Sequence, residues 1–188
     1  MDYQATTQKL NDYRKQISSL RAKMRETQEN VEPQEVENYV FKTPKGDVSL
    51  SELFGDNEDL FIIHNMGKSC AYCTMWADGF NGVLHHLENR AAFVITTPDD
   101  PETQQKFAQS RGWNFRMVSH QGTGFAQEMG YQGEHGFTPG VSVYKKEGGK
   151  IYRVSDANLG PYDDFCSVWH FFAMIPEGVG GWEAKFAY

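Results

Sequence analysis

The residues of this chain best suited to chemistry are two cysteines, Cys70 and Cys73, separated by two residues. Two thiols at this spacing can bind a metal ion, form a structural bridge or act as a redox couple. The stretch before them, residues 60–65, is a short apolar run typical of a buried strand. In residues 71–88 the apolar side chains recur with helical spacing. Cys70 is therefore predicted at a turn where a strand ends and a helix begins.

The start of a helix lowers the pKa of a thiol placed there. The first amide groups of a helix have no partners within it, and the helix dipole adds partial positive charge. We therefore expect Cys70 to have a lowered pKa and to be the exposed nucleophile, with Lys68 adding positive charge nearby. Cys73, one turn further along, is expected to be more buried and to act as the resolving thiol.

A metal site is the main alternative for the two cysteines, and it needs two further ligands. The chain has no second Cys-x-x-Cys motif. The other available ligands lie far away in the sequence, and they are Cys166, His170, His85 and His86. Cys166 is surrounded by apolar residues, so we interpret it as a core residue. We predict no metal site and no cofactor.

The composition indicates a globular protein and limits its partners. The chain has 188 residues, of which 39% are hydrophobic, and a net charge of −7. The acidic balance argues against nucleic-acid and anionic-membrane partners. There is no window of about 20 apolar residues, and the N-terminus has no apolar core of a secretion signal. We therefore expect a cytoplasmic protein, whose reducing surroundings favour a metal-binding or catalytic use of the two cysteines.

Residues 1–36 are predicted to form an N-terminal helical arm, and residues 37–188 a separate domain. Within the arm, a helix is expected at residues 3–29. Its apolar side chains recur at alternating steps of three and four, and they are Leu10, Tyr13, Ile17, Leu20 and Met24. This stripe either packs on the chain's own domain or forms a homodimer through the helix.

The domain shows alternating strand and helix signals. In order, we expect strands at 39–42 and 60–65, a helix at 71–88, a strand at 91–97, a helix ending at Gly112, a strand at 115–119, one or two helical turns near 125, a hairpin around Gly148 and Gly149, and a helix between Pro161 and Pro176. This order predicts an α/β fold with a mixed central sheet and helices on both of its faces.

A proline stands directly before the first strand of the hairpin, in the pair Thr138-Pro139. Proline is tolerated at the entrance of a strand because no ladder hydrogen bond is lost there. In the predicted topology this loop reaches the helix end that carries Cys70. A cis peptide bond would expose the Thr138 backbone to an extended substrate. An ordinary trans bond in a turn is the alternative.

Together these residues resemble the thioredoxin superfamily. The resemblance is carried by "LFIIHNMGKSCAYC", "AAFVITT" and "FTPGVSVYKKEGGKIYRV". It implies a thioredoxin-like fold in which a cis-proline, here Pro139, faces the two motif cysteines. Residues 39–55 and 115–131 resemble the peroxiredoxin-like branch more than the minimal thioredoxins.

A closer resemblance, over nearly the whole chain, is to a bacterial thioredoxin-like family of unknown function, described as predicted dithiol-disulfide oxidoreductases. It is carried by "CAYCTMWADGFNGVLHHL", "TPGVSVY" and "LGPYDDFCSVWHFFAMIPEGVGGW". Trp76 and Asp78 look like signature positions of that family. Trp76 is four residues from Phe80, which favours core packing, whereas Asp78 either caps a bend or lies at the rim of the site. Tyr72 resembles the tyrosine of the glutaredoxin Pro-Tyr pair, and it either shields the sulfur or is a surface aromatic.

The sequence also departs from the patterns of these families. Peroxiredoxins carry a proline and a threonine at set places before the reactive cysteine, where this chain has Ile63, seven residues before Cys70, and Gly67, three residues before it. Their peroxide site is therefore absent. Thioredoxins bury an acid six residues before the first cysteine, where this chain has His64. We hypothesise that His64 accepts the proton of Cys73. The alternative is a strand histidine satisfied by a backbone partner.

The sequence thus predicts a thiol-disulfide oxidoreductase that acts on a protein or small-molecule thiol or disulfide. In this prediction Cys70 attacks the disulfide and Cys73 resolves the mixed disulfide. Two alternatives stay open. One is a thiol-dependent peroxidase in which Cys70 passes through sulfenic acid. The other is a non-catalytic binding module that keeps the same fold.

Overall fold

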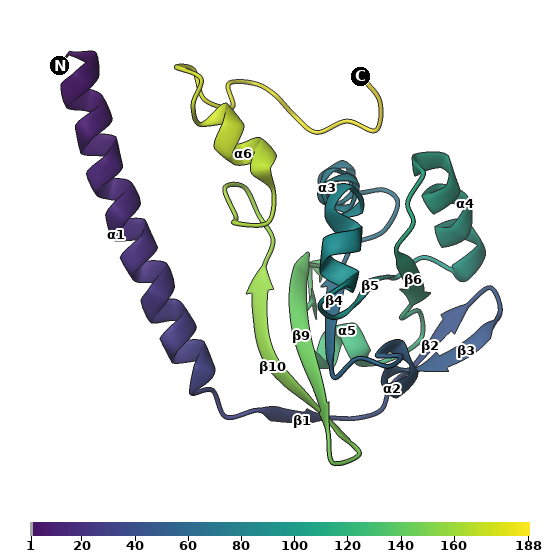
Figure 1. Cartoon of the computed structure of the whole chain (residues 1–188). Helices are drawn as coiled ribbons and strands as arrows, with labels where there is room; N and C mark the ends of the chain where they lie inside the picture. The colour runs from purple at the N-terminus through teal and green to yellow at the C-terminus, as the bar shows by residue number, and fades with distance from the viewer. Residues whose placement is uncertain (1) are drawn as a thin grey trace. The chain divides into compact units, whose positions relative to one another are not determined.

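Figure 1 shows the computed structural model of the chain, which describes residues 2–188. The chain forms two compact units, which divide between Pro33 and Gln34. The first contains helix α1 (Tyr3–Glu29), which begins where the Asp2 carboxylate accepts a hydrogen bond of 2.8 Å from the Ala5 amide. The predicted helix at 3–29 is confirmed. The five residues of its apolar stripe are between 46% and 67% exposed.

The second unit is built on an eight-stranded sheet with the strand order β1-β10-β9-β4-β5-β6-β2-β3. Its strands are β1 (Gln34–Val36), β2 (Val40–Thr43), β3 (Gly46–Ser49), β4 (Asp59–His64), β5 (Ala92–Thr97), β6 (Arg116–Ser119), β9 (Gly140–Glu147) and β10 (Lys150–Asn158). Strands β4, β5 and β6 are parallel, and the other pairs are antiparallel. Strands β7 (Gln132–Gly133) and β8 (Gly136–Phe137) form a separate small sheet. The predicted mixed sheet is confirmed. Residues 34–36, at the end of the expected arm, form β1 of this sheet.

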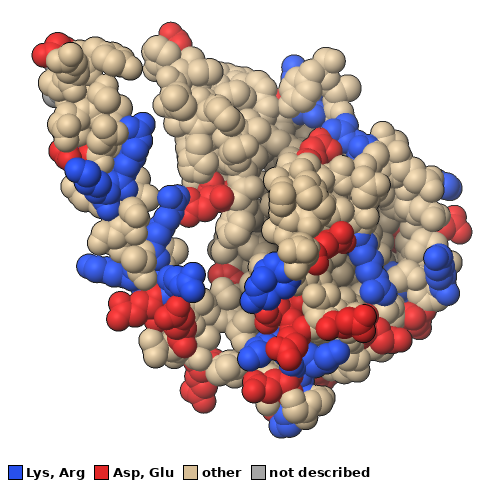
Figure 2. Space-filling view, viewed as in Figure 1, with Lys and Arg blue, Asp and Glu red and all other residues tan. Residues whose placement is uncertain are grey.

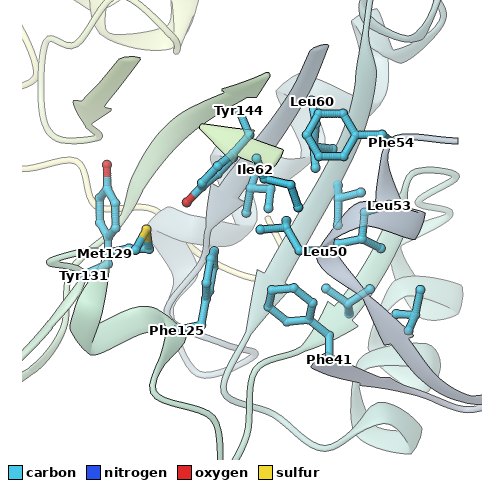
Figure 3. Packing of buried hydrophobic residues seen from close by; sticks show 14 residues of the cluster. Phe41, Leu50, Leu53, Phe54, Leu60, Ile62, Phe125, Met129, Tyr131 and Tyr144 are labelled. Atoms are coloured by element: carbon cyan, nitrogen blue, oxygen red, sulfur yellow. The ribbon is translucent and has the colours of Figure 1, made fainter. Parts of the chain in front are cut away.

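Helices cover both faces of the sheet. Successive residues of a strand point to opposite sides, so each face of the sheet packs against its own set of helices. On one side, Leu60 and Ile62 of β4 pack with α2 (Leu50–Leu53) and α5 (Phe125–Glu128), in the core drawn in Figure 3. On the other side, Ile63 packs with α3 (Ala71–Glu88) and α4 (Pro101–Arg111). This two-sided arrangement places the start of α3 at the edge of the sheet where β4 ends.

Short-range signals in the sequence predict the ends of several elements correctly. Helix α4 ends at Gly112, whose φ of +68° is a left-handed conformation that glycine adopts without steric cost. The hairpin of β9 and β10 turns at Gly148 and Gly149, as predicted. The short helical segment expected near residue 125 is α5.

The C-terminal helix is shorter than the sequence predicts. A helix was expected between residues 161 and 176, but α6 spans only Ser167–Phe172. The Asp163 carboxylate accepts hydrogen bonds of 2.9, 2.7 and 3.0 Å from the amides of Gly160, Phe165 and Cys166. These bonds fold the chain into a turn before α6. A side chain that bonds nearby amides competes with the helical hydrogen bonds, which delays the start of the helix.

The surface carries charged side chains of both signs close to one another on the face shown in Figure 2. Arg90 forms an ion pair with Asp59 at 2.8 Å, and Lys150 forms one with Glu35 at 2.7 Å. Exposed pairs of this kind contribute little to stability. Within residues 2–188, no helix has the length and the apolar character that crossing a membrane requires.

Candidate active site

Cys70 lies where the sequence predicts it, directly before the first residue of α3. Its backbone is extended, and its sulfur accepts a hydrogen bond of 3.0 Å from the Cys73 amide. Its carbonyl accepts two further bonds, from the Thr74 amide and the Thr74 hydroxyl, each 3.0 Å long. The sulfur therefore occupies the capping position, where the unpaired amides and the dipole of the helix favour negative charge.

The two thiols have opposite pKa shifts. The hydrogen bond from the Cys73 thiol is the largest cause that lowers the pKa of Cys70, to about 7, and the amides of Cys73 and Tyr72 lower it further against the effect of burial. The bond to Cys70, burial and the charge of Cys70 raise the pKa of Cys73 well above its ordinary value. Cys73 is 2% exposed, whereas Cys70 is partly exposed. Cys70 can therefore be the accessible thiolate, and Cys73 its protonated partner.

We expect the alkylation rate of Cys70 to have a pH midpoint near 7. Below the midpoint the thiol is protonated, so the rate should fall roughly tenfold for each pH unit. Above it the rate should level off, because the thiolate is fully formed. The measurement is iodoacetamide labelling of Cys70 at a series of pH values, followed by peptide mass.

The chain provides an internal control for this measurement. Burial raises the pKa of Cys166, so that thiol should be labelled slowly across the same pH series. A midpoint for Cys70 at or above about 8.5, the value of an ordinary thiol, would show that the helix start does not stabilise its thiolate.

Two polar residues that the sequence analysis missed hold the loop between β4 and α3. Asn65 accepts a hydrogen bond of 2.8 Å from the Gly67 amide and donates one of 3.4 Å to the Cys73 carbonyl. Asp99 accepts a bond of 2.8 Å from the Lys68 amide. Lys68 was predicted to act through its charge, and here its amide anchors the loop while its side chain is exposed. The position of Asn65 and Asp99 in the sequence could have indicated this role. Each follows one of two neighbouring parallel strands, and the carboxyl ends of such strands meet at one edge of the sheet.

The Thr138–Pro139 peptide bond is trans. The prediction of a cis bond, which the resemblance implied, is therefore wrong. The Thr138 amide donates to the Tyr131 carbonyl at 2.9 Å, and the Pro139 carbonyl accepts from the Leu159 amide at 3.0 Å. The Thr138 amide is therefore occupied within the chain. Pro139 directly precedes β9, whose first residue pairs with the last residue of β4. The proline loop thus lies at the end of β4, from which the chain continues to Cys70.

His64 lies on the side of β4 that faces away from α3. Alternate strand residues point to opposite sides, and Ile63 is the neighbour that packs with α3. The His64 ring stacks on Tyr131 with a centroid distance of 3.7 Å, and its Nε2 forms a hydrogen bond of 2.9 Å with the Ser142 hydroxyl. Burial holds its pKa well below the ordinary value. The predicted role as proton acceptor for Cys73 is therefore corrected to a packing role.

Two aromatic residues of α3 pack against the segment around α6. Tyr72, between the two cysteines, stacks on Trp169 with a centroid distance of 6.0 Å. Trp76 is buried, and its indole N–H donates to the Asp163 carboxylate at 2.9 Å. The core packing predicted for Trp76 is confirmed. Asp163, which the sequence analysis did not single out, thus joins the turn before α6 to the helix that carries the cysteines.

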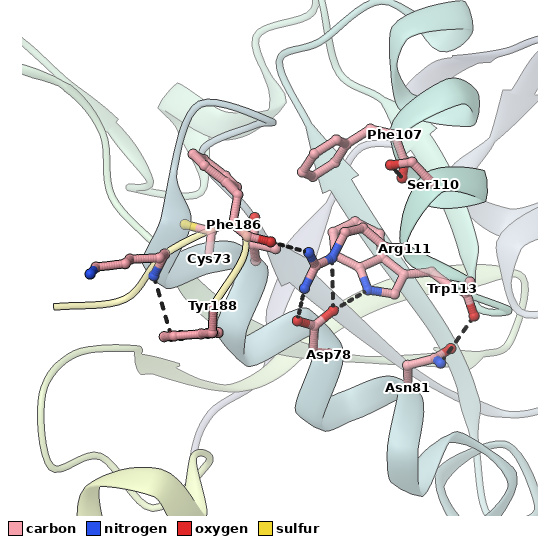
Figure 4. Close-up of polar contacts among 12 residues, drawn as sticks. Cys73, Asp78, Asn81, Phe107, Ser110, Arg111, Trp113, Phe186 and Tyr188 are labelled. Atoms are coloured by element: carbon pink, nitrogen blue, oxygen red, sulfur yellow. Dashed lines mark hydrogen bonds and ion pairs between the residues drawn. The ribbon is translucent and has the colours of Figure 1, made fainter.

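Asp78 forms an ion pair with Arg111, as Figure 4 shows. Its carboxylate also accepts a hydrogen bond of 2.8 Å from the Trp113 indole. Arg111 in turn donates to the Phe186 carbonyl at 2.6 Å. Asp78 therefore ties α3 to α4 and to the C-terminal segment, and it supports the fold beside the cysteines.

The histidines and the third cysteine do not form a metal site in the part of the chain that the structure describes. No three His, Cys, Asp or Glu side chains in residues 2–188 are grouped as metal ligands would be. Cys166 is buried in the core on the α3 side of the sheet, as predicted. The ring of His170 forms a hydrogen bond of 3.0 Å with the Asp163 carbonyl.

The domain is similar to solved peroxiredoxin structures. It is similar to peroxidoxin BcpB from Mycobacterium tuberculosis, with 22% identity and a TM-score of 0.56 over 67% of this chain and 84% of that one. Reduced Prx3 from Vibrio vulnificus gives 11% identity and a TM-score of 0.58 over 73% and 94%. A peroxiredoxin-like protein from Aquifex aeolicus gives 16% identity and a TM-score of 0.54 over 68% of this chain and 75% of that one. These similarities confirm the predicted thioredoxin-like fold of the peroxiredoxin-like branch.

The sequence itself matches one family model over nearly its whole length. No curated protein matches the sequence. The matching model covers residues 1–185, which include the N-terminal helix and the C-terminal segment, and it is described as a bacterial protein of unknown function. The chain therefore belongs to DUF899, a family of bacterial proteins of unknown function.

Proposed function

We propose that the protein is a thiol-disulfide oxidoreductase in which Cys70 is the nucleophile and Cys73 the resolving thiol. The observation that carries the proposal is the hydrogen bond of 3.0 Å from the Cys73 amide to the Cys70 sulfur at the start of α3. This bond favours the thiolate, which is the nucleophilic form of cysteine. With a pKa of about 7, Cys70 is about half ionised at neutral pH.

The proposed reaction is a two-electron exchange between the protein and a disulfide. The Cys70 thiolate attacks one sulfur of the substrate and forms a mixed disulfide, while the other substrate sulfur leaves as a thiolate and takes up a proton from solvent. Cys73 then loses its proton, attacks the Cys70 sulfur and releases the second substrate thiolate. The substrate is reduced to two thiols, and the protein is left with a Cys70–Cys73 disulfide. A thiol reductant restores the dithiol.

The raised pKa of Cys73 fits its place as the second nucleophile. Two of the causes that raise it are the hydrogen bond to Cys70 and the charge of Cys70. Both causes disappear once the Cys70 sulfur is part of a mixed disulfide, because that sulfur is then uncharged. The pKa of Cys73 therefore falls at the step in which Cys73 must ionise. Before that step its proton is retained, which keeps the two thiols from competing for the substrate.

The proposal is tested by equilibrating the protein in glutathione buffers of graded redox poise and measuring mass after acid quenching. The Cys166→Ala variant is used, so that the two motif cysteines are the only thiols. We expect both thiols to disappear together as one intramolecular disulfide, with a single midpoint. A protein that keeps two free thiols in fully oxidising buffer would contradict the proposal. That result would instead favour the alternative of a non-catalytic binding module with the same fold.

Thiol-dependent peroxide reduction is the second candidate, and the similarity to solved peroxiredoxin structures favours it. In this reaction the Cys70 thiolate attacks a peroxide oxygen, becomes sulfenic acid and releases an alkoxide or hydroxide, and Cys73 then displaces water to form the disulfide. Ile63 and Gly67 occupy the places of the peroxiredoxin proline and threonine, respectively, and this difference disfavours peroxide reduction. Rapid oxidation of Cys70 by hydrogen peroxide, without any disulfide present, would establish this candidate instead.

A further inference from the structure

Asp99 makes contacts that the proposed chemistry does not explain. Its Oδ2 accepts a hydrogen bond of 2.8 Å from the Lys68 amide, two residues before Cys70. The carboxylate is held in place from its own side, because Oδ2 also accepts a bond of 3.2 Å from the Thr97 hydroxyl. Thr97 is buried at the end of β5, and its hydroxyl oxygen in turn accepts the side-chain amide of Gln104 at 2.9 Å. Asp99 is therefore a fixed support rather than a surface side chain in solvent.

The backbone of the loop fits closely against this carboxylate. Gly67 has a φ of +100°, and a Cβ atom added to it would lie 2.8 Å from Asp99 Oδ2. No side chain can therefore be placed at this position without moving the carboxylate or the loop. The Gly67 carbonyl accepts the Cys70 amide at 3.1 Å. A chain of contacts thus runs from the end of β5 through Asp99 and Gly67 to the backbone of Cys70.

We propose that Asp99 is a positioning residue that fixes the Gly67–Lys68 peptide and thereby holds the Cys70 sulfur at the start of α3. The inference rests on the proposed function, in which Cys70 is the nucleophile. Cys70 lies outside the first helical turn, so its backbone is set by the loop that precedes it as well as by the helix. Without the support of Asp99 the loop gains freedom, and the sulfur spends less time within reach of the Cys73 amide.

The charge of Asp99 and its hydrogen bond act on Cys70 in opposite directions. A nearby negative charge disfavours a thiolate and raises its pKa, so removal of the charge alone lowers the Cys70 pKa or leaves it unchanged. Loss of the support weakens the amide bond to the sulfur and raises the Cys70 pKa. His120, in the loop after β6, is a titratable group that Asp99 also influences, and burial lowers its pKa. Because its pKa is lowered, His120 is mostly uncharged around the expected Cys70 midpoint near pH 7.

The experiment compares the alkylation midpoint of Cys70 in three variants, each with Cys166→Ala. In Asp99→Ala we expect the midpoint to rise by about one pH unit, which is about a tenfold loss of thiolate below the midpoint. In Asp99→Asn, which keeps an oxygen acceptor without the charge, the midpoint should stay or fall. Asp100→Ala is the matched control, because it removes the neighbouring carboxylate that caps α4 through Thr103. It should leave the midpoint unchanged.

A midpoint that stays or falls in Asp99→Ala would overturn the inference. If that variant does not fold, Gly67→Ala tests the same link with the carboxylate present. Its Cβ displaces the loop, so the Cys70 midpoint should rise there as well, and an unchanged midpoint would also overturn the inference. The readout uses an alkylating agent and no disulfide substrate. A failure of disulfide exchange would therefore leave this test intact, and the two failures can be told apart.

Discussion

Cys70→Ser is expected to abolish disulfide exchange, whereas Cys73→Ser should leave the first attack intact and accumulate the mixed disulfide. A serine hydroxyl at the helix start stays protonated at neutral pH, so the nucleophile is lost and the rate should fall roughly 1,000-fold or more. In Cys73→Ser the hydroxyl can still donate a hydrogen bond to the Cys70 sulfur, but it cannot form a disulfide. The measurement is the release of the coloured thiolate from an aromatic disulfide, combined with the mass of the protein.

The expected masses separate the roles of the two cysteines. With Cys73→Ser, one equivalent of thiolate should be released and half of the substrate should stay bound to Cys70. With the wild-type pair, two equivalents should be released and no adduct should persist. Cys166→Ala serves as the control and should behave as the wild type, because that thiol is buried in the core. A stable adduct on Cys73 in Cys70→Ser, formed at the wild-type rate, would reverse the assignment.

Gly140→Ala should destabilise the domain by about 3 kcal/mol, at the upper end of the usual cost of overpacking. A Cβ atom at this position would lie 2.0 Å from a ring carbon of Tyr131 and 2.9 Å from the backbone carbonyl of Ala157. The Tyr131 ring stacks on His64, and Phe125 stacks on the same histidine at a centroid distance of 5.4 Å, so the ring has little room to retreat. The measurement is the free energy of unfolding in urea.

Gly82→Ala is the matched control for this prediction. Gly82 lies within α3, has no positive φ and has nothing within 4 Å of an added Cβ. Alanine in a helix interior is favoured over glycine, so the variant should be more stable by about 0.5–1 kcal/mol. If Gly140→Ala matched this gain, the close approach of Tyr131 to β9 would not be present in solution. Gly140 pairs with the last residue of β4, the strand that leads to Cys70. The stability of Gly140→Ala therefore also tests how much the close packing at Gly140 supports that strand.

Much of the fold could be predicted because its signals are local. The strand, turn and helix around Cys70 follow from an apolar run, a glycine turn and an amphipathic stretch, and all three lie within 30 residues of sequence. The stop of α4 at Gly112 and the hairpin turn at Gly148 depend only on the left-handed conformation that glycine allows. The parallel core then follows from the alternation of strands and helices. Local patterns were thus sufficient for the place of Cys70 at the start of a helix.

Contacts between distant segments settled the rest of the site. The period of two along β4 puts His64 on a definite side, but which side α3 covers depends on the packing of the whole sheet. Asp99 reaches Lys68 across 31 positions, and Asp163 reaches Trp76 across 87. Such pairs depend on the order of strands in the sheet and on the path of the C-terminal segment. No pattern within a few turns of the chain contains that information, because it arises only when the elements pack together.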